Sequence, residues 1–252
     1  MGGYRYNAGD DQMVAWNRNF TSRIGDGSGD PEEEYLATLR FVAACKPRSE
    51  LLDIGCGLGR VVDVMRHDVA SIVGLEPDAD RFGTCHASFH DGGRIQIHHC
   101  TSADYRAAHP GRRFDIVVVS MVIQHVPTRT CDLILADVPE LLADDGIGVI
   151  ATTQQDAERF TFQSDQTPRS REAFDRYASD SSDQTHGIPV RQFSKASFLA
   201  ALDRAGLDMV RWGQFSYLRP EKLGWFAKWM GSTTDAIKDV ATSQYAVVRR
   251  RR

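Results

Sequence analysis

The segment that most constrains the fold is LLDIGCGLGR, residues 51–60, where an apolar run leads into a glycine-rich turn. Asp53 stands near the end of the run, and Gly55, Gly57 and Gly59 follow before a stretch of helical periodicity. Glycines at such a turn permit positive φ angles and let a ligand approach the backbone closely. The segment therefore predicts a strand, a ligand-binding loop and a helix in direct succession.

Short apolar runs alternate with amphipathic stretches through the residues that follow. This alternation is typical of βαβ units and predicts an α/β fold with a parallel sheet. The valine-rich run FDIVVVSMV suits a central strand that is covered on both faces. In this part of the chain we expect strands at 51–54, 71–75, 94–98, 114–122 and 147–153, and helices at 58–67, 78–89 and 129–143.

Three other regions depart from this alternation or extend it. Residues 1–48 combine an aromatic patch with an acid-led helical stretch and predict an N-terminal helical cap before a main domain at 49–252. Residues 154–192 are polar, with one short helical stretch at 170–178, and predict an insertion after the fifth strand. A helix at 195–207, a strand at 208–218, a helix at 221–239 and a strand at 244–250 bring the sheet to seven strands.

Composition narrows the class of protein. The chain has 252 residues, 42% hydrophobic and 25% charged, which is ordinary for a globular protein. A net charge of −4 with scattered basic residues gives no nucleic-acid footprint, and no apolar run is long enough to span a membrane. Five cysteines without disulfide-scaffold spacing indicate a reducing compartment. We therefore expect a cytoplasmic protein without a nucleic-acid or membrane partner, and we consider a homodimer.

Two further acids follow strand ends. Glu76 ends the second predicted strand, where a carboxylate can accept hydrogen bonds from two ribose hydroxyls. Asp104 follows the third strand, where an acid can accept from an adenine amino group. A dinucleotide fingerprint would need a third glycine where Arg60 stands, which argues against a pyrophosphate ligand. Together the three strand ends predict an adenosine pocket.

At the level of these motifs the chain resembles the class I S-adenosylmethionine-dependent methyltransferases. LLDIGCGLG is similar to the first motif of that family, GLEPD to the second, TSADY to the third, and FDIVVVSMVIQHVP and LLADDGIGVI to the fourth and fifth. RQFSKASFLAALDRAGL also resembles a stretch of its small-molecule members. The resemblance implies a Rossmann-like sheet with helices on both faces. It also implies S-adenosylmethionine as the cofactor, with S-adenosylhomocysteine as the product.

The resemblance further implies roles for individual residues. Asp53 and the glycines would hold the methionine part of the cofactor, Glu76 the ribose and Asp104 the adenine, while Ser120 and Met121 would line its site. The predicted cofactor-binding residues are Asp53, Gly55, Cys56, Gly57, Gly59, Glu76, Pro77, Asp104, Ser120 and Met121.

His125 in VIQHVP is the candidate general base, because it follows the fourth strand near the expected site of transfer and imidazole titrates near neutral pH. A packing or helix-start role for His125 is the alternative. Cys56 is better explained by packing than as a reactive thiol. His86 and His90 lie one helical turn apart, but a zinc site needs four convergent ligands, so we expect no metal.

Three functions remain open at this point. The first is methyl transfer to an oxygen or nitrogen of a small-molecule acceptor, such as a natural product or a sugar-like compound. The second is methylation of a protein or peptide N-terminus. The third is a non-catalytic protein that keeps the fold and binds the cofactor.

Overall fold

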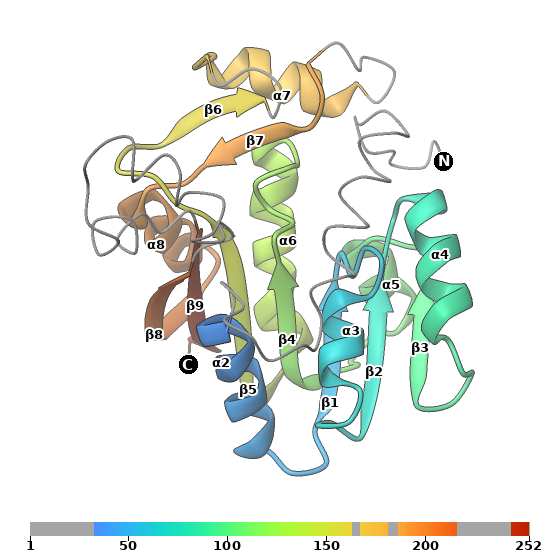
Figure 1. The fold of residues 1–252 in the computed structure, drawn as a ribbon. Coiled ribbons are helices and arrows are strands. Elements are labelled where there is room, and N and C mark those ends of the chain that lie inside the picture. Colours follow the sequence, from blue (N-terminus) through green and yellow to red (C-terminus); the bar gives the residue numbers. More distant parts are fainter. Residues whose placement is uncertain (1–32, 163–166, 181–185, 216–242, 252) are drawn as a thin grey trace, which may run out of the picture.

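The computed structural model describes residues 33–162, 167–180, 186–215 and 243–251, and its centre is one seven-stranded sheet (Figure 1). The strand order is β3-β2-β1-β4-β5-β9-β8. Strands β1 to β5 are parallel, and β9 runs antiparallel to both β5 and β8. The predicted seven-stranded, mostly parallel α/β sheet is thus confirmed. Its strands are β1 (Glu50–Ile54), β2 (Ser71–Leu75), β3 (Ile95–His98), β4 (Phe114–Ser120), β5 (Leu142–Thr153), β8 (Leu207–Phe215) and β9 (Ser243–Arg250).

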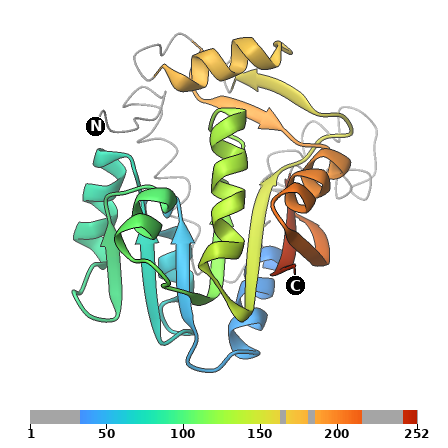
Figure 2. The ribbon, with the colours of Figure 1, turned by 180° about the vertical axis from the view of Figure 1, so that it is seen from behind.

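Helices cover both faces of this sheet, as the opposite views of Figures 1 and 2 show. One face carries α2 (Glu33–Ala44), α3 (Arg60–Met65) and α4 (Ala79–Phe89), and the other carries α5 (Ser102–Ala108), α6 (Thr128–Leu141) and α8 (Lys195–Arg204). An apolar core lies on each face of the sheet, and alternate residues of β4 enter the two cores. Val118 packs toward α2 and α3, and Val117 packs toward α6. Because both faces are buried, the centre of the strand, residues 116–119, is apolar throughout.

The end of α6 differs from the prediction. The fifth strand begins at Leu142, directly after the helix, and not at residue 147. Leu142 already pairs with Phe114 of β4, and a register shift separates this pair from Ile116 and Ile147. Residues 142–146 are therefore an irregular extension of the strand, and the helix predicted at 129–143 ends at Leu141.

The insertion after β5 forms a separate layer beyond the carboxyl ends of the parallel strands (Figure 1). It contains α7 (Arg171–Ser179), which confirms the helix predicted at 170–178. It also contains an antiparallel pair that was not predicted, β6 (Arg159–Phe162) and β7 (Pro189–Gln192). The ring centroids of Phe162 and Tyr177 lie 4.5 Å apart, so strand and helix share a small aromatic core.

The described part of the predicted N-terminal cap packs on the main sheet. Tyr35 of α2 stacks on Phe215 of β8 at 5.0 Å, and the Tyr245 hydroxyl donates to Glu34 at 3.0 Å. The boundary between a cap and a main domain stays a prediction, because residues 1–32 lie outside the described residues, as does the helix predicted at 221–239. None of the described helices has the length and apolar character that a membrane crossing needs.

Candidate cofactor site

A cavity opens where the order of the parallel strands reverses, at the carboxyl ends of β1 and β4. Ligands of open α/β sheets bind at this position, because the helices on either side diverge there. The loops after β2 and β3 and the first turns of α6 complete the wall. Its polar and charged lining residues are Asp53, Arg60, Glu76, Arg81, Thr101, Ser102, Ser120 and Thr130.

The glycine turn brings two loops into contact at the floor of this cavity. Gly55 has a φ of 72°, in the left-handed region that favours glycine. A Cβ atom at this position would lie only 2.6 Å from Cγ2 of Val122, which follows β4. Gly55 and Cys56 line the cavity, whereas Gly57 and Gly59 are not among its lining residues and act through the shape of the turn.

Glu76 is fixed by the backbone around it. One carboxylate oxygen accepts from the Gly57 N–H at 2.8 Å and the other from the Asp78 N–H at 2.9 Å. Burial raises the pKa of Glu76, while the nearby Arg81 guanidinium opposes that shift. Each oxygen keeps a further lone pair, so the carboxylate can still accept hydrogen bonds from a ligand diol.

Asp53 and Arg60 give the same cavity two opposite charges. Asp53 is 1% exposed, and neither of its oxygens has a hydrogen-bond partner. Burial raises its pKa to about 7, although the charge of Arg60 opposes the shift. Arg60 donates from Nη2 to the Ser120 hydroxyl at 2.8 Å. A buried carboxylate without a partner is costly, and a cationic ligand group would relieve that cost.

Ser120 and Met121 line the cavity, as predicted. Met121 has a φ of 57°, which is rare for a residue with a side chain, and its N–H donates to the Ala151 carbonyl at 2.9 Å. Backbone strain of this kind persists only where surrounding contacts impose it, and it is frequent at binding sites.

The structure does not bring Asp104 to the cavity. Its exposed carboxylate accepts from the Thr101 hydroxyl at 2.8 Å, and the two residues form the capping box of α5. Thr101 and Ser102 line the cavity in its place. The threonine-to-acid spacing in TSAD is itself a signal for a capping box, so the sequence held the evidence for this other role.

His125 is also kept away from the cavity lining. Nδ1 lies 2.8 Å from the Pro189 carbonyl and therefore carries the proton that it donates. Nε2 lies 3.1 Å from the Gln124 amide nitrogen and accepts from it. Burial lowers the pKa of His125 to about 4, which keeps the ring neutral. The geometry supports the packing alternative over the role of a base.

The cysteines and histidines near the cavity pack against one another. The sulfurs of Cys56 and Cys85 lie 3.9 Å apart, and this contact, followed by burial, raises the pKa of Cys56. The rings of His86 and His90 stack with their centroids 4.1 Å apart. Across the described ranges, no three His, Cys, Asp or Glu side chains gather in a way that could hold a metal ion.

Sequence reasoning missed one wall of the cavity. Val126 lines it from the loop before α6, and Thr130 and Ile134 line it from the first turns of α6. Thr130 and Ile134 are four residues apart and so lie on one face of the helix, and this spacing was the available signal. Arg60 and Arg81 were missed as well, because the sequence does not show which way a surface arginine turns.

Comparison with known proteins identifies the family. A family model described as a methyltransferase domain matches residues 31–211. The chain belongs to this methyltransferase family. Its fold is that of the class I S-adenosylmethionine-dependent methyltransferases, and the cofactor expected from the sequence agrees with the family.

Individual relatives of this methyltransferase are distant. A ubiquinone biosynthesis O-methyltransferase from Thiobacillus denitrificans is 30% identical over 108 residues, which are 39% of this chain and 46% of that protein. The chain thus spans about half or less of the curated relatives that it matches first.

Solved structures share its fold. An S-adenosylmethionine-dependent methyltransferase from Clostridium acetobutylicum has a TM-score of 0.61 at 8% identity, covering 96% of this chain and 99% of its own. The 1,6-didemethyltoxoflavin-N1-methyltransferase of Burkholderia thailandensis, solved with 1,6-didemethyltoxoflavin and S-adenosylhomocysteine, has a TM-score of 0.59 at 14% identity, covering 97% of this chain and 92% of its own.

Proposed function

We propose that this methyltransferase transfers the methyl group of S-adenosylmethionine to an oxygen or nitrogen of a small-molecule acceptor. The observation that carries the proposal is the charge pattern of the cavity, in which the unpartnered Asp53, the opposite charge of Arg60 and the preset Glu76 line one space. The O-methyltransferase and N1-methyltransferase named among its relatives support both kinds of acceptor atom. A natural product or a sugar-like compound is the acceptor class that we favour.

The residues present fit the cofactor part by part. Glu76 would accept hydrogen bonds from the two ribose hydroxyls, Asp53 would pair with the amino group of the methionine part, and Arg60 would pair with its carboxylate. Val126 in the loop before α6 and Ile134 on α6 offer apolar surface for the adenine, with Thr130 between them. When bound, the cofactor supplies an electrophilic methyl group on a sulfonium.

The chain itself mainly binds the two ligands, orients them and excludes water from the site. His125 is engaged through both ring nitrogens and does not line the cavity. Asp53 and Glu76 are the carboxylates among the described lining residues, and the cofactor would occupy both. We therefore propose that alignment of the acceptor atom matters more than a dedicated base.

The two alternatives differ from this proposal in testable ways. The layer of β6, β7 and α7 beyond the strand ends favours a small acceptor over a protein or peptide N-terminus, which needs an open approach. The intact charge pattern favours turnover over cofactor binding alone. The cytoplasmic location and the homodimer stay predictions.

Calorimetric titration with S-adenosylhomocysteine tests the pocket. We expect binding by the wild type and a loss of about 1–3 kcal/mol in Glu76→Gln, because a charged hydrogen-bond acceptor is removed. Glu140→Gln is the matched control, since Glu140 faces Arg113 on the outside of α6. A wild-type protein that does not bind would overturn the proposal.

Methyl transfer is then measured by mass spectrometry with panels of phenols, amines and sugars, and with peptides that have free N-termini. Product from a small acceptor supports the proposal. Product from peptides alone would favour the first alternative, and tight S-adenosylhomocysteine binding without any product would favour the second.

A further inference from the structure

The loop that joins β4 to α6, residues 121–127, contacts both the cofactor cavity and the insertion. Met121, Val122 and Val126 line the cavity. Between them, the Gln124 carbonyl accepts from the N–H of Arg191 at 2.8 Å, and His125 donates to the Pro189 carbonyl at 2.8 Å. Strand β7 of the insertion is therefore bonded to the same short loop that forms a wall of the cavity.

The first N–H groups of α6, directly after this loop, need hydrogen-bond acceptors from outside the helix. The first N–H groups of a helix have no acceptor within the helix, and a negative charge near them is stabilising. Pro127 at the N-cap provides no side-chain acceptor, and the first turn of α6 contains no acid. The N-cap and first turn of α6 therefore supply no capping side chain of their own.

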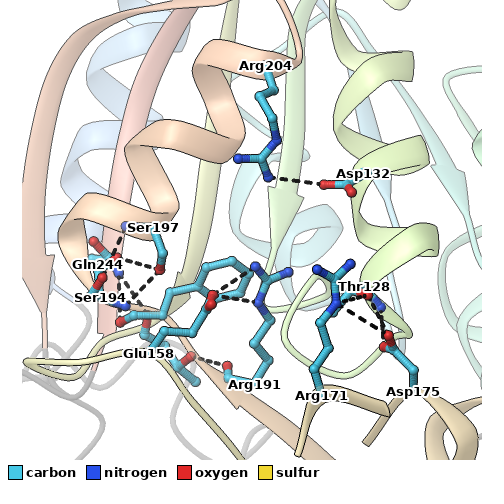
Figure 3. A network of polar contacts seen from close by, with 12 residues as sticks. Thr128, Asp132, Glu158, Arg171, Asp175, Arg191, Ser194, Ser197, Arg204 and Gln244 are labelled. Carbon is cyan, nitrogen blue, oxygen red and sulfur yellow. Dashed lines mark hydrogen bonds and ion pairs between the residues drawn. The ribbon is translucent and has the colours of Figure 1, made fainter.

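Asp175 of the insertion helix α7 supplies a capping carboxylate (Figure 3). One oxygen accepts from the Thr128 N–H at 2.7 Å and the other from the Thr128 hydroxyl at 2.6 Å. Arg171 donates from Nε to the same hydroxyl at 3.0 Å and lies 3.6 Å from Asp175. The contact thus joins α6 and α7 through two residues that are 47 apart in sequence.

Thr128 lies between two residues of the cavity wall. Val126 precedes it by two positions and Thr130 follows it by two, and both line the cavity. Thr128 is itself buried, so the cap forms inside the packed structure and not at a frayed surface end. A shift of the cap would therefore move the wall on which we place the adenine.

We propose that Asp175 is a positioning residue that caps α6 from the insertion and couples the docking of the insertion to occupancy of the cofactor cavity. The coupling part rests on the proposed cofactor site. Coupling is reciprocal, so cofactor binding stabilises the docked insertion to the same extent that docking strengthens cofactor binding. The docked position of the insertion is then most stable when the cofactor is bound.

The first test compares S-adenosylhomocysteine affinity in Asp175→Asn and Glu172→Gln by calorimetry. The asparagine keeps the size of the side chain but removes the charge at the helix start, and we expect affinity to fall about five-fold or more. Glu172 is an exposed acid in the first turn of α7, so its variant loses the same charge without touching Thr128 and should bind like the wild type. Equal affinity in all three proteins would overturn the coupling.

Hydrogen exchange tests the same idea without relying on a single variant. In the wild type, S-adenosylhomocysteine should slow amide exchange in residues 186–192, and unchanged exchange there in a protein that binds would overturn the coupling. Without ligand, Asp175→Asn should raise exchange in residues 121–134 while Glu172→Gln does not. Unchanged exchange at 121–134 would overturn the positioning role.

A wild type that fails to bind S-adenosylhomocysteine contradicts the proposed function instead. The comparison of exchange without ligand still tests the role of Asp175 in that case.

Discussion

The cofactor cavity and the insertion lie at the same edge of the sheet. The contacts that fix Glu76 in the cavity join residues close in the sequence, whereas those that dock the insertion join residues far apart. In the cavity, the Gly57 N–H and the Glu76 carboxylate that it meets are 19 residues apart. In the insertion, His125 and its acceptor Pro189 are 64 residues apart. The Glu76 side of the cavity is built within a single βαβ unit, whereas the insertion docks only after distant segments have packed.

This difference predicts how the two regions respond to change. The cavity depends on the shape of a glycine turn and on a few buried charges, so single substitutions there should act on ligand binding. The insertion is docked by several side-chain and backbone contacts. Because the others remain when one is lost, single substitutions there should have smaller effects on ligand binding. The following variants test this contrast.

The largest effect is expected for Gly55→Val. The positive φ angle strains any side chain by about 1–3 kcal/mol, and the new Cβ would lie 2.6 Å from Val122. Either the turn or the loop after β4 must then move, and both line the cavity. We expect S-adenosylhomocysteine binding to fall by at least about a hundred-fold in calorimetry, with a lower melting temperature.

Gly83→Ala is the matched control for that variant. Gly83 lies exposed in α4, and an added Cβ would meet no atom within 4 Å. Alanine favours the helix, so stability should rise by about 0.5–1 kcal/mol while binding stays unchanged. Wild-type affinity in folded Gly55→Val would show that the turn is not part of the site.

Asp53→Asn should have the next largest effect and should move binding and stability in opposite directions. The substitution removes a charge that would pair with the amino group of the ligand, so affinity at pH 8 should fall by about 1–3 kcal/mol. It also removes an unpartnered buried charge, so the free energy of unfolding at pH 8 should rise. Calorimetry and chemical denaturation at one pH measure the two changes.

The pH dependence of the wild type gives an independent check on Asp53. Its pKa rises from 3.8 to about 7 on folding, so its contribution to stability is complete below 3.8 and is lost as the pH rises through 7. Ligand affinity should change in the opposite direction to stability. It should increase as Asp53 ionises between pH 6 and pH 8. The asparagine variant should lack both trends, whereas a wild-type affinity that is flat across this range would contradict the assignment.

The same contrast of range explains what the sequence could and could not predict. Asp53 and Glu76 were placed correctly at the cavity because a strand end fixes where each residue lies. Asp104 was misplaced because the same local pattern also encodes a helix cap, which takes up the carboxylate. Arg60 was missed because its direction depends on the Ser120 hydroxyl, which is 60 residues away in sequence.

The two short strands of the insertion were missed for a related reason. β6 and β7 are four residues each, and their pairing joins Phe162 to Pro189 across the helix between them. The helix α7 has its own periodicity and a serine cap, so it could be predicted from local sequence. The strands gain their stability from each other, and a run of four residues gives little sign of such pairing.

His125→Asn should have the smallest effect and separates the two roles considered for this residue. The asparagine amide can replace Nδ1 as the donor to Pro189, so we expect the unfolding free energy to fall by about 1 kcal/mol. S-adenosylhomocysteine affinity should stay within about two-fold of the wild type, because the ring does not line the cavity. Denaturant titration and calorimetry measure these two quantities, with the exposed His67→Asn as the control.

The pH dependence of stability tests the buried, neutral state of His125, and turnover tests the role of a base. Burial lowers the pKa of His125 from 6.5 to about 4 on folding, so its contribution to stability is present above 6.5 and is lost as the pH falls toward 4. The stability advantage of the wild type over His125→Asn should therefore shrink across that window. A general base would instead show itself in turnover, by a loss of about 10²–10⁴-fold with any accepted substrate. Such a loss without a change in ligand affinity would support a catalytic role for His125 and contradict the packing role.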